Sequence, residues 1–576
     1  MIGPSLHPGK KRGPVMENTR QGILELLLDL ARIPSVTGSP GEAEAGRFIH
    51  DRLGQLGYFR DHPDDLRFIP VPGDPFGRRA VMAIVEAEPA VKGTVVLTGH
   101  FDVVGTGEFG PLERLAFSPV EYTAALRERG LEGEAGEDLV SGDFLFGRGV
   151  MDMKCGLAAE MALLCEAAAD PSSLGVNLLF LAVPDEEIGS AGMRAAVPAL
   201  AGIRDERGLE YLGAILAEPG AAGSPDIEGE AIFLGSVGKV MPFFYCVGAG
   251  THVGRYFDGL SASLMASHLS VLVEGDPRLA DRSGDETGPP PACLFLRDLR
   301  DGYSVTTPDR AAVFFNYMTL SRAPAEVMGE MMKVAEEAAF AAFEQVKRSA
   351  SKLGAAFDTS RPRVVTFEEF AHETEAALGG GTKARIRGLV EAMDPALDDR
   401  HRSLAVVTEM LRWDPPGVPM VIVGFLPPYY PHRFNEEGSE GERRARKAAG
   451  HVIGTARREY GVDLSLKEYF AGICDLCYLG FQGSAMDMLC VASNTPGWGS
   501  VYRVALGELK ALDIPVLNLG PSGKDPHKIT ERLRLSYSLE VFPGLLREAV
   551  LSLARQGGRV LLWVSTGPAG WSGLPS

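Results

Sequence analysis

Five residues of metal-binding type stand directly after predicted strands or at the start of a predicted helix. They are His100, Asp152, Glu187, Glu218 and His527. The carboxyl ends of the strands in an open α/β sheet gather at one edge, so residues distant in sequence converge there. Two imidazoles and three carboxylates suit a pair of zinc-like ions. The pattern therefore predicts a two-metal site at a sheet edge.

Each of these motifs also has an ordinary structural interpretation when it is taken alone. A His-x-Asp after a strand is most often a polar pair, and a Glu-Glu is usually part of a solvated loop. Glu218 precedes Pro-Gly, which is typical of a turn, and His527 stands where it could cap a following helix. Together these interpretations would require five independent coincidences at one sheet edge. We therefore favour the metal site.

The chemistry of a two-metal site predicts a role for each ligand. Asp152 would bridge two cations, which lie about 3.5–4 Å apart in two-metal hydrolases. His100 and Glu218 would bind one ion, while Glu187 and His527 would bind the other.

Two carboxylates beside these ligands have predicted roles other than metal binding. Asp102 is placed to orient His100 through the second ring nitrogen of the imidazole. Glu186 precedes a ligand and points elsewhere, so it could take a proton from the attacking water and pass it to the leaving amine. Glu186 is therefore the predicted general base.

The overall composition is that of a soluble globular protein. The chain has 576 residues, 45% hydrophobic and 23% charged, which is enough for two or three domains. Its net charge of −19 argues against nucleic acid as a partner, because binding to phosphates needs a basic surface. No apolar stretch approaches the roughly 20 residues that cross a bilayer, and no signal sequence is evident. We expect a cytoplasmic protein without a membrane partner.

The cysteines do not form a pattern that requires disulfides or zinc. There are seven, an odd number in a long chain. Cys474 and Cys477 form a CxxC pair, but no second pair accompanies them, and a structural zinc site usually needs four ligands. They are interpreted as structural thiols.

Strands and helices alternate in the first part of the chain. Strands are expected at residues 80–85, 94–98, 176–182 and 212–217, with helices at 23–30, 40–56, 152–168 and 192–200. Ser39 and Glu42 suggest a capping box for the second of these helices. This alternation predicts a largely parallel sheet with helices on both faces. Residues 105–143 are read as a long, functional loop.

The pattern changes near residue 235, where a second, smaller α+β domain is expected. Strands at 239–247, 311–320 and 420–425 and helices at 260–273 and 325–347 would form it, and residues 350–415 have no clear period. We predict four segments: a disordered extension (1–16), the first part of a catalytic domain (17–238), an inserted domain (239–434) that carries its own insertion at about 350–415, and the second part of the catalytic domain (435–576). A helix at 440–460 would return the chain to the first sheet.

These motifs resemble a known family of di-zinc metallopeptidases, which includes aminoacylase, ArgE, DapE and carboxypeptidase G. The matching segments are His-x-Asp at 100–102, Gly-x-x-Asp-Met-Lys-x-Gly at 149–156, Glu-Glu-x-Gly-Ser at 186–190 and Gly-Pro…His…Glu at 520–531. The resemblance extends over residues 20–550. The sequences of residues 315–322, 427–431 and 469–475 are similar to those of the RocB arginine-utilisation subgroup.

The resemblance implies a fold and several residue roles. The fold would be a zinc-aminopeptidase-like mixed sheet, largely parallel, interrupted by the inserted domain acting as a lid. His252 matches the lid histidine that holds the developing oxyanion. Arg322 resembles the arginine that receives a substrate carboxylate, with Asn316 assisting. A cis peptide is implied between Asp152 and Met153.

The expected activity follows from the ligands and the resemblance together. It is hydrolysis of an amide bond in a short peptide or N-acyl amino acid with a free carboxylate, using two divalent ions, zinc by preference and cobalt or manganese as alternatives. The larger lid leaves open whether His252 acts across a homodimer or within one chain. The alternative is a binding or regulatory protein that keeps the fold without the chemistry, but Glu186 and all five ligands are present, which favours the enzyme.

Overall fold

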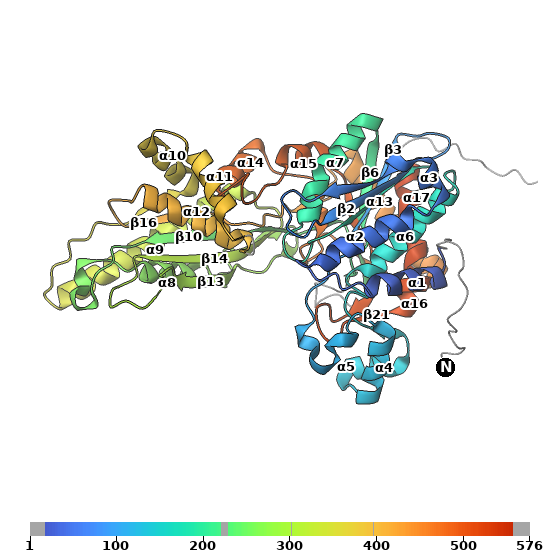
Figure 1. Cartoon of the computed structure of the whole chain (residues 1–576), viewed down its shortest axis with the longest axis horizontal. Coiled ribbons are helices and arrows are strands. Elements are labelled where there is room, and N and C mark those ends of the chain that lie inside the picture. The colour runs from blue at the N-terminus through green and yellow to red at the C-terminus, as the bar shows by residue number, and fades with distance from the viewer. Residues whose placement is uncertain (1–17, 221–228, 301, 395–396, 557–576) are drawn as a thin grey trace, which may run out of the picture.

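The computed structural model describes residues 18–220, 229–300, 302–394 and 397–556. The predicted disorder of residues 1–16 lies outside these ranges. The molecule has two parts that lie end to end along its long axis, and the chain passes from the first to the second and back (Figure 1). Each part is built around its own sheet.

The larger part contains an eight-stranded mixed sheet. Its spatial order is β1 (Leu66–Pro70), β2 (Arg79–Val85), β5 (Asn177–Val183), β3 (Gly93–His100), β6 (Glu210–Leu216), β19 (Val516–Asn518), β7 (Glu230–Phe233) and β18 (Leu464–Lys467). Strands β5, β3, β6 and β19 are mutually parallel, whereas β2 runs antiparallel to both of its neighbours, β1 and β5. Every residue of β5 is buried, and successive side chains point to opposite faces, so both faces of the sheet are covered.

Helices cover the two faces. Those of the larger part are α1 (Arg20–Ala31), α2 (Pro40–Leu53), α3 (Gly57–Asp61), α6 (Lys154–Ala169), α7 (Ala191–Arg207), α13 (Glu440–Thr455), α15 (Leu506–Leu512), α16 (Leu535–Glu540) and α17 (Phe542–Gln556). Helices α6, α17 and α13 pack side by side against the central strands, and α2 and α7 pack on β1 and β2. The predicted α/β sheet with helices on both faces is confirmed. None of the helices in the described part of the chain combines the length and hydropathy that a membrane span requires.

The predicted loop at residues 105–143 is wrong, because these residues are largely helical. They form a 3₁₀ segment (Gly107–Leu115), α4 (Pro119–Arg129) and α5 (Gly133–Ser141), which project from the larger part (Figure 1). Tyr122, Leu126 and Leu139 bury against Phe109 and the short strand β4 (Phe144–Phe146) in a separate small core. The many glycines and charges of the segment concealed this apolar spacing.

The smaller part, the lid, has a six-stranded sheet. Its order is β13 (Ala292–Asp298), β14 (Arg310–Thr319), β10 (Pro242–Val247), β16 (Met420–Phe425) and β15 (Arg363–Thr366), and β9 (Gly238–Val240) also pairs with β14. The single strand predicted at 239–247 is therefore two strands, interrupted at Met241. Helices α8 (Ala262–Val273) and α9 (Pro324–Lys352) pack against this sheet.

The insertion at about 350–415 covers the other face of the lid sheet. It contains β15, α10 (Phe367–Leu378), α11 (Thr382–Ala392) and α12 (Asp399–Trp413). Phe244 and Cys246 of β10 pack in the same core as α8 and α9, whereas the alternating Phe243 and Tyr245 pack with the insertion helices. The insertion thus gives the lid a second hydrophobic core.

Two linking segments join the lid to the larger part. Strand β8 (Gly235–Ser236) pairs with β17 (Arg433–Phe434), and the main chains of Lys239 and Tyr430 exchange hydrogen bonds of 2.7 and 2.9 Å. The sequence predicts that all residues from 435 onward belong to the catalytic domain. However, α14 (Ala485–Asn494) packs on α9, α10 and β16 of the lid.

Two predicted helix starts differ from those observed. Ser39 accepts a hydrogen bond from the amide of Gly41, but the Glu42 carboxylate accepts from Gly38 and pairs with Arg78, so no capping box forms. Helix α6 begins at Lys154, which leaves Asp152 in the turn before the helix.

Candidate two-metal site

The ligand-type residues converge because three parallel strands end side by side. Strand β3 lies between β5 and β6, with His100 opposite Val183 of β5 and Thr98 opposite Leu216 of β6. The Glu186–Glu187 turn therefore follows on one side of His100, and Glu218 follows on the other. The convergence at the strand ends has the geometry that the sequence predicts.

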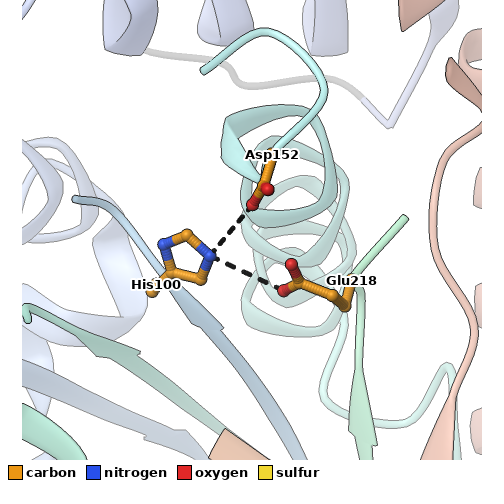
Figure 2. Close-up of side chains that lie close together, drawn as sticks. All are labelled: His100, Asp152 and Glu218. Atoms are coloured by element: carbon orange, nitrogen blue, oxygen red, sulfur yellow. Dashed lines mark ion pairs between the residues drawn. The ribbon is translucent and has the colours of Figure 1, made fainter. Parts of the chain in front are cut away.

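The first group consists of His100, Asp152 and Glu218 (Figure 2). The Nε2 atom of His100 lies 3.2 Å from Oδ1 of Asp152 and 3.6 Å from Oε2 of Glu218. All three side chains are buried.

The second group consists of Asp152, Glu187 and His527. The Nε2 atom of His527 lies 3.1 Å from Oδ2 of Asp152 and 3.2 Å from Oε2 of Glu187. The His527 side chain is about half exposed, so this group lies toward solvent. Asp152 belongs to both groups and gives one carboxylate oxygen to each.

The groups fit divalent cations because they bring unpartnered ligand atoms together. Nε2 of His100, Oδ1 of Asp152 and Oε2 of Glu218 are all buried and lack a hydrogen-bond partner. Burying such atoms without a partner costs free energy, and a cation would satisfy all three. The hydrogen bonds to Asp152 and Glu187 raise the pKa of His527 to about 10. Without cations, these two carboxylates therefore stabilise the protonated form of His527.

Small residues allow the close packing behind the ligands. A Cβ atom at Gly156 of α6 would lie 2.1 Å from the carbonyl oxygen of Ala217, and one at Gly520 would lie 2.2 Å from that of Glu218. Neither position can take a larger residue without displacing the backbone that carries Glu218. The peptide between Asp152 and Met153 is cis, as the resemblance predicts.

Asp102 supports the site in a way that the sequence did not predict. Its main-chain carbonyl lies 3.0 Å from Nδ1 of His100, and its carboxylate lies 3.6 Å away. The carboxylate instead accepts hydrogen bonds from the amides of Glu186 (3.1 Å) and Glu187 (3.2 Å) and from the Thr37 hydroxyl. One residue therefore orients the imidazole and holds the glutamate turn beside it.

A buried arginine, which the sequence analysis missed, holds the same turn from the other side. Arg78 lies 2.6 Å from Asp185, 3.1 Å from Glu42 and 2.6 Å from Asp74. Asp185 has a positive φ of 70° and accepts a hydrogen bond from the amide of Ala191, which closes the turn. The sequence gives no signal for this network, because its members come from three separate elements.

A second arginine holds the loop that carries His527. Arg148 is 1% exposed, lies 2.5 Å from Glu531 and donates to the carbonyl oxygen of His527 at 3.0 Å. Tyr122 of α4 donates to the carbonyl of Ile529 at 2.7 Å. The helical segment 107–141 thus anchors the loop of the more exposed ligand.

Glu186 lies next to the first group without belonging to it. Its Oε2 atom is 4.0 Å from Nε2 of His100. Burial raises its pKa well above the ordinary value, His100 opposes this, and the carboxylate of Asp475 adds to it. Asp475 is fully buried, and neither of its oxygens has a hydrogen-bond partner. The sequence analysis quoted Asp475 only as the end of a subgroup segment and did not identify it as a site residue.

The three predicted lid residues lie apart from both ligand groups. His252 is exposed, and its Nδ1 atom accepts from the amide of Gly254. Arg322 bonds to Tyr317 and, at 2.7 Å, to Glu330. Asn316 lies on β14 opposite Ala292 of the edge strand β13. Among the described residues, none of the three hydrogen-bonds or pairs with a ligand-type residue.

The CxxC pair is buried and reduced. The Sγ atoms of Cys474 and Cys477 lie 3.2 and 3.6 Å from the Ser236 hydroxyl. In the described part of the chain, neither thiol belongs to a group of metal-ligand type.

Comparison with known proteins assigns the chain to one family. Residues 96–479 match the model of Peptidase family M20/M25/M40. The chain belongs to this family of hydrolases, as the sequence motifs predict.

Two relatives match nearly the whole chain, and a third matches part of it. The chain is 35% identical over 545 residues to the protein YqjN of Bacillus subtilis, covering 93% of this chain and 97% of YqjN. It is 27% identical over 553 residues to the protein RocB of the same organism, covering 93% and 95%. A succinyl-diaminopimelate desuccinylase of Methylorubrum extorquens is 33% identical over 221 residues, 38% of this chain and 48% of the desuccinylase.

The fold also matches a solved structure. A crystal structure of a tripeptidase from Staphylococcus aureus aligns with a TM-score of 0.50 at 14% identity, covering 93% of this chain and 99% of the tripeptidase. At this identity the likeness concerns the fold alone.

Proposed function

We propose that this chain hydrolyses an amide bond in a short peptide or N-acyl amino acid, with two divalent ions held at the site. The observation that carries the proposal is the position of Asp152, which gives one buried oxygen to each of two His-and-carboxylate groups. Two ions so bound would polarise the substrate carbonyl and lower the pKa of a water molecule.

The donor set suggests which ion each residue would hold. His100 and Glu218 would hold one, Glu187 and His527 the other, and Asp152 both. Imidazole and carboxylate ligands suit zinc, with cobalt and manganese as alternatives.

Glu186 would move the proton. Its carboxylate lies 4.0 Å from the His100 imidazole and belongs to neither ligand group. It would take a proton from the attacking water and deliver it to the leaving nitrogen. The turn held by Asp102 and Arg78 fixes its position.

The lid would complete the site. His252 is exposed on the lid in this chain, so stabilising the developing oxyanion would require lid movement or the lid of a second copy in a homodimer.

The test is hydrolysis of a substrate panel by protein loaded with zinc, cobalt or manganese. The panel should contain N-acetyl and N-succinyl amino acids and dipeptides. The similarity to RocB makes acylated arginine the first compound to assay. Turnover that EDTA abolishes and metal restores is the expected result. Binding of these compounds without turnover by the metal-loaded protein would favour the non-catalytic alternative.

A further inference from the structure

Lys239 is a half-buried cation at the junction between the two parts of the molecule. It lies in the middle of β9, on the segment that leads into the lid. Its ammonium group lies 5.2 Å from the centre of the Tyr430 ring, on the other linking segment. Among the described residues, the ammonium group of Lys239 has no hydrogen bond or ion pair, although its main chain bonds to Tyr430. The junction therefore holds a cation without a counter-ion.

This cation lies close to the proposed general base. The Tyr430 hydroxyl accepts a hydrogen bond of 3.3 Å from Ser190, and Ser190 closes the turn that carries Glu186. Tyr430 thus contacts Lys239 through its ring and the Glu186 turn through its hydroxyl group. Burial lowers the pKa of Lys239 to about 8, and Glu186 acts in the opposite direction, as a carboxylate within electrostatic range must.

A second cation approaches from the lid insertion. Arg400 is near the start of α12, and its positive charge also lowers the pKa of Lys239. The Nε atom of Arg400 donates to Asp398 at 3.0 Å, and within the described part of the chain this is the only ion pair of its guanidinium. Like charges that approach each other in a partly buried place cost free energy unless an anion lies between them.

The arginine expected to bind the substrate carboxylate is engaged elsewhere. Arg322 bonds to Tyr317, to Glu330 and to the carbonyl of Leu279, and Asp281 lies 3.6 Å from it. Lys239, in contrast, has an uncommitted ammonium group.

We propose that Lys239, together with Arg400, receives the free carboxylate of the substrate and so selects acids over neutral analogues. The inference rests on the proposed amide hydrolysis and names the substrate group that the same site would recognise. An ammonium and a guanidinium that share one carboxylate form charge-assisted hydrogen bonds. The insertion would then have a direct role, because α12 supplies the second cation.

The test compares an N-acetyl amino acid with its C-terminal primary amide, which differ in the carboxylate alone. In Lys239→Met, kcat/KM for the acid should fall about 10- to 100-fold, mainly through KM, because a charge-assisted hydrogen bond is lost. For the amide it should change less than about threefold. Lys239→Arg should recover part of the loss. Lys333→Met, at an exposed lysine of α9, is the matched control and should behave like the wild type.

Two results would overturn the inference. An equal loss for acid and amide, mainly in kcat, would show that Lys239 acts on Glu186 or on the linking segments. No loss for either would show that it has no role in binding.

Calorimetry keeps the inference testable if no compound is turned over. Binding of the acids and amides to zinc-loaded Glu186→Gln protein should favour the acid, and Lys239→Met in that background should remove the preference. If the wild type turns over nothing but this preference is found, hydrolysis of these compounds fails while the carboxylate site stands. Absence of a preference, or of binding, would refute the carboxylate site.

Discussion

Asp152 gives each of its carboxylate oxygens to a different imidazole, and this single residue defines the site at the residue scale. Its two partners, His100 and His527, are 427 positions apart, yet each lies within 3.2 Å of it. The ligand types and their positions at strand ends could be predicted from the sequence because the chemistry of metal ions restricts both. The supporting residues Arg78, Asp185 and Asp475 could not, because a buried ion pair has no characteristic spacing.

The adjacent glutamates offer a separation of roles. Glu186→Gln removes the proton acceptor and keeps the size, so it should lower kcat by roughly 10²-fold or more while both metal ions remain bound. Glu187→Gln should instead lower metal content, because it removes a ligand. Activity assays paired with metal analysis of both variants check this. Near-wild-type turnover by Glu186→Gln would contradict the assigned role.

Arg78 gives a prediction about the support of this turn. Arg78→Met leaves Glu42, Asp74 and Asp185 without their shared cation, so unfolding free energy should fall by about 3–5 kcal/mol. Loss of the turn geometry should also lower affinity for the ion held by Glu187. The neighbouring Arg79 stacks on the Phe68 ring at 3.6 Å, and Arg79→Met should cost about 1 kcal/mol or less. Denaturation and zinc titration of the two variants distinguish them. Equal effects would show that the network does not hold the turn.

At the element scale, two short linking segments join the lid to the larger part. The lid carries His252, which belongs to neither ligand group. The sequence predicted the parallel strands and the long lid helix because their apolar periods are continuous. It failed at 105–143 and at α10–α12, where glycine, charge and short helices weaken the period and tertiary packing decides the structure. These elements nevertheless contribute to the site region, since α4 anchors the His527 loop and α12 brings Arg400 toward Lys239.

His252 tests whether the lid acts within one chain. His252→Ala should lower kcat with metal content unchanged, because the residue belongs to neither ligand group. Mixing this variant with Asp152→Ala chains then separates the two arrangements. Recovered activity would show that the histidine acts across a homodimer. Confirmed mixed dimers without activity would show action within one chain.

The linking segment that contains Tyr430 and β17 also contains His432, a histidine that should make stability depend on pH. Burial lowers the pKa of His432 from 6.5 to about 4, while Asp281, Asp487 and Glu326 act in the opposite direction and Arg433 adds to the lowering. A histidine with a lowered folded-state pKa binds fewer protons when folded, so its contribution is full above pH 6.5 and is lost as pH falls toward 4.

The corresponding variant is His432→Gln, which is uncharged at every pH. Between pH 6.5 and 4, the wild type should lose about 3 kcal/mol more unfolding free energy than the variant, since each pKa unit corresponds to about 1.36 kcal/mol. Chemical denaturation across this range measures the difference. Parallel pH curves for the two proteins would contradict the buried neutral histidine.

At the scale of the whole molecule, two sheets are joined where the proposed chemistry occurs, and one hydrophobic cluster extends from the larger part into the lid. The ligand-type atoms converge at the strand ends of the larger part, and Lys239, whose ammonium group is unpaired among the described residues, lies at the junction beside them. Membership of the peptidase family agrees with a site in this region. The second sheet could be predicted because the residue pattern of the sequence changes near residue 235, just before β9. The packing of α14 on the lid could not, because nothing local distinguishes a helix that crosses between domains.

The most direct test of the central claim is the anomalous X-ray signal, measured at the zinc edge, of crystals grown with saturating zinc. We predict two peaks about 3.5–4 Å apart, one beside His100 and Glu218 and the other beside Glu187 and His527, with Asp152 between them. In Asp152→Ala both peaks should weaken, because the shared ligand is lost. A single peak, or two peaks that Asp152 does not bridge, would contradict the two-metal site.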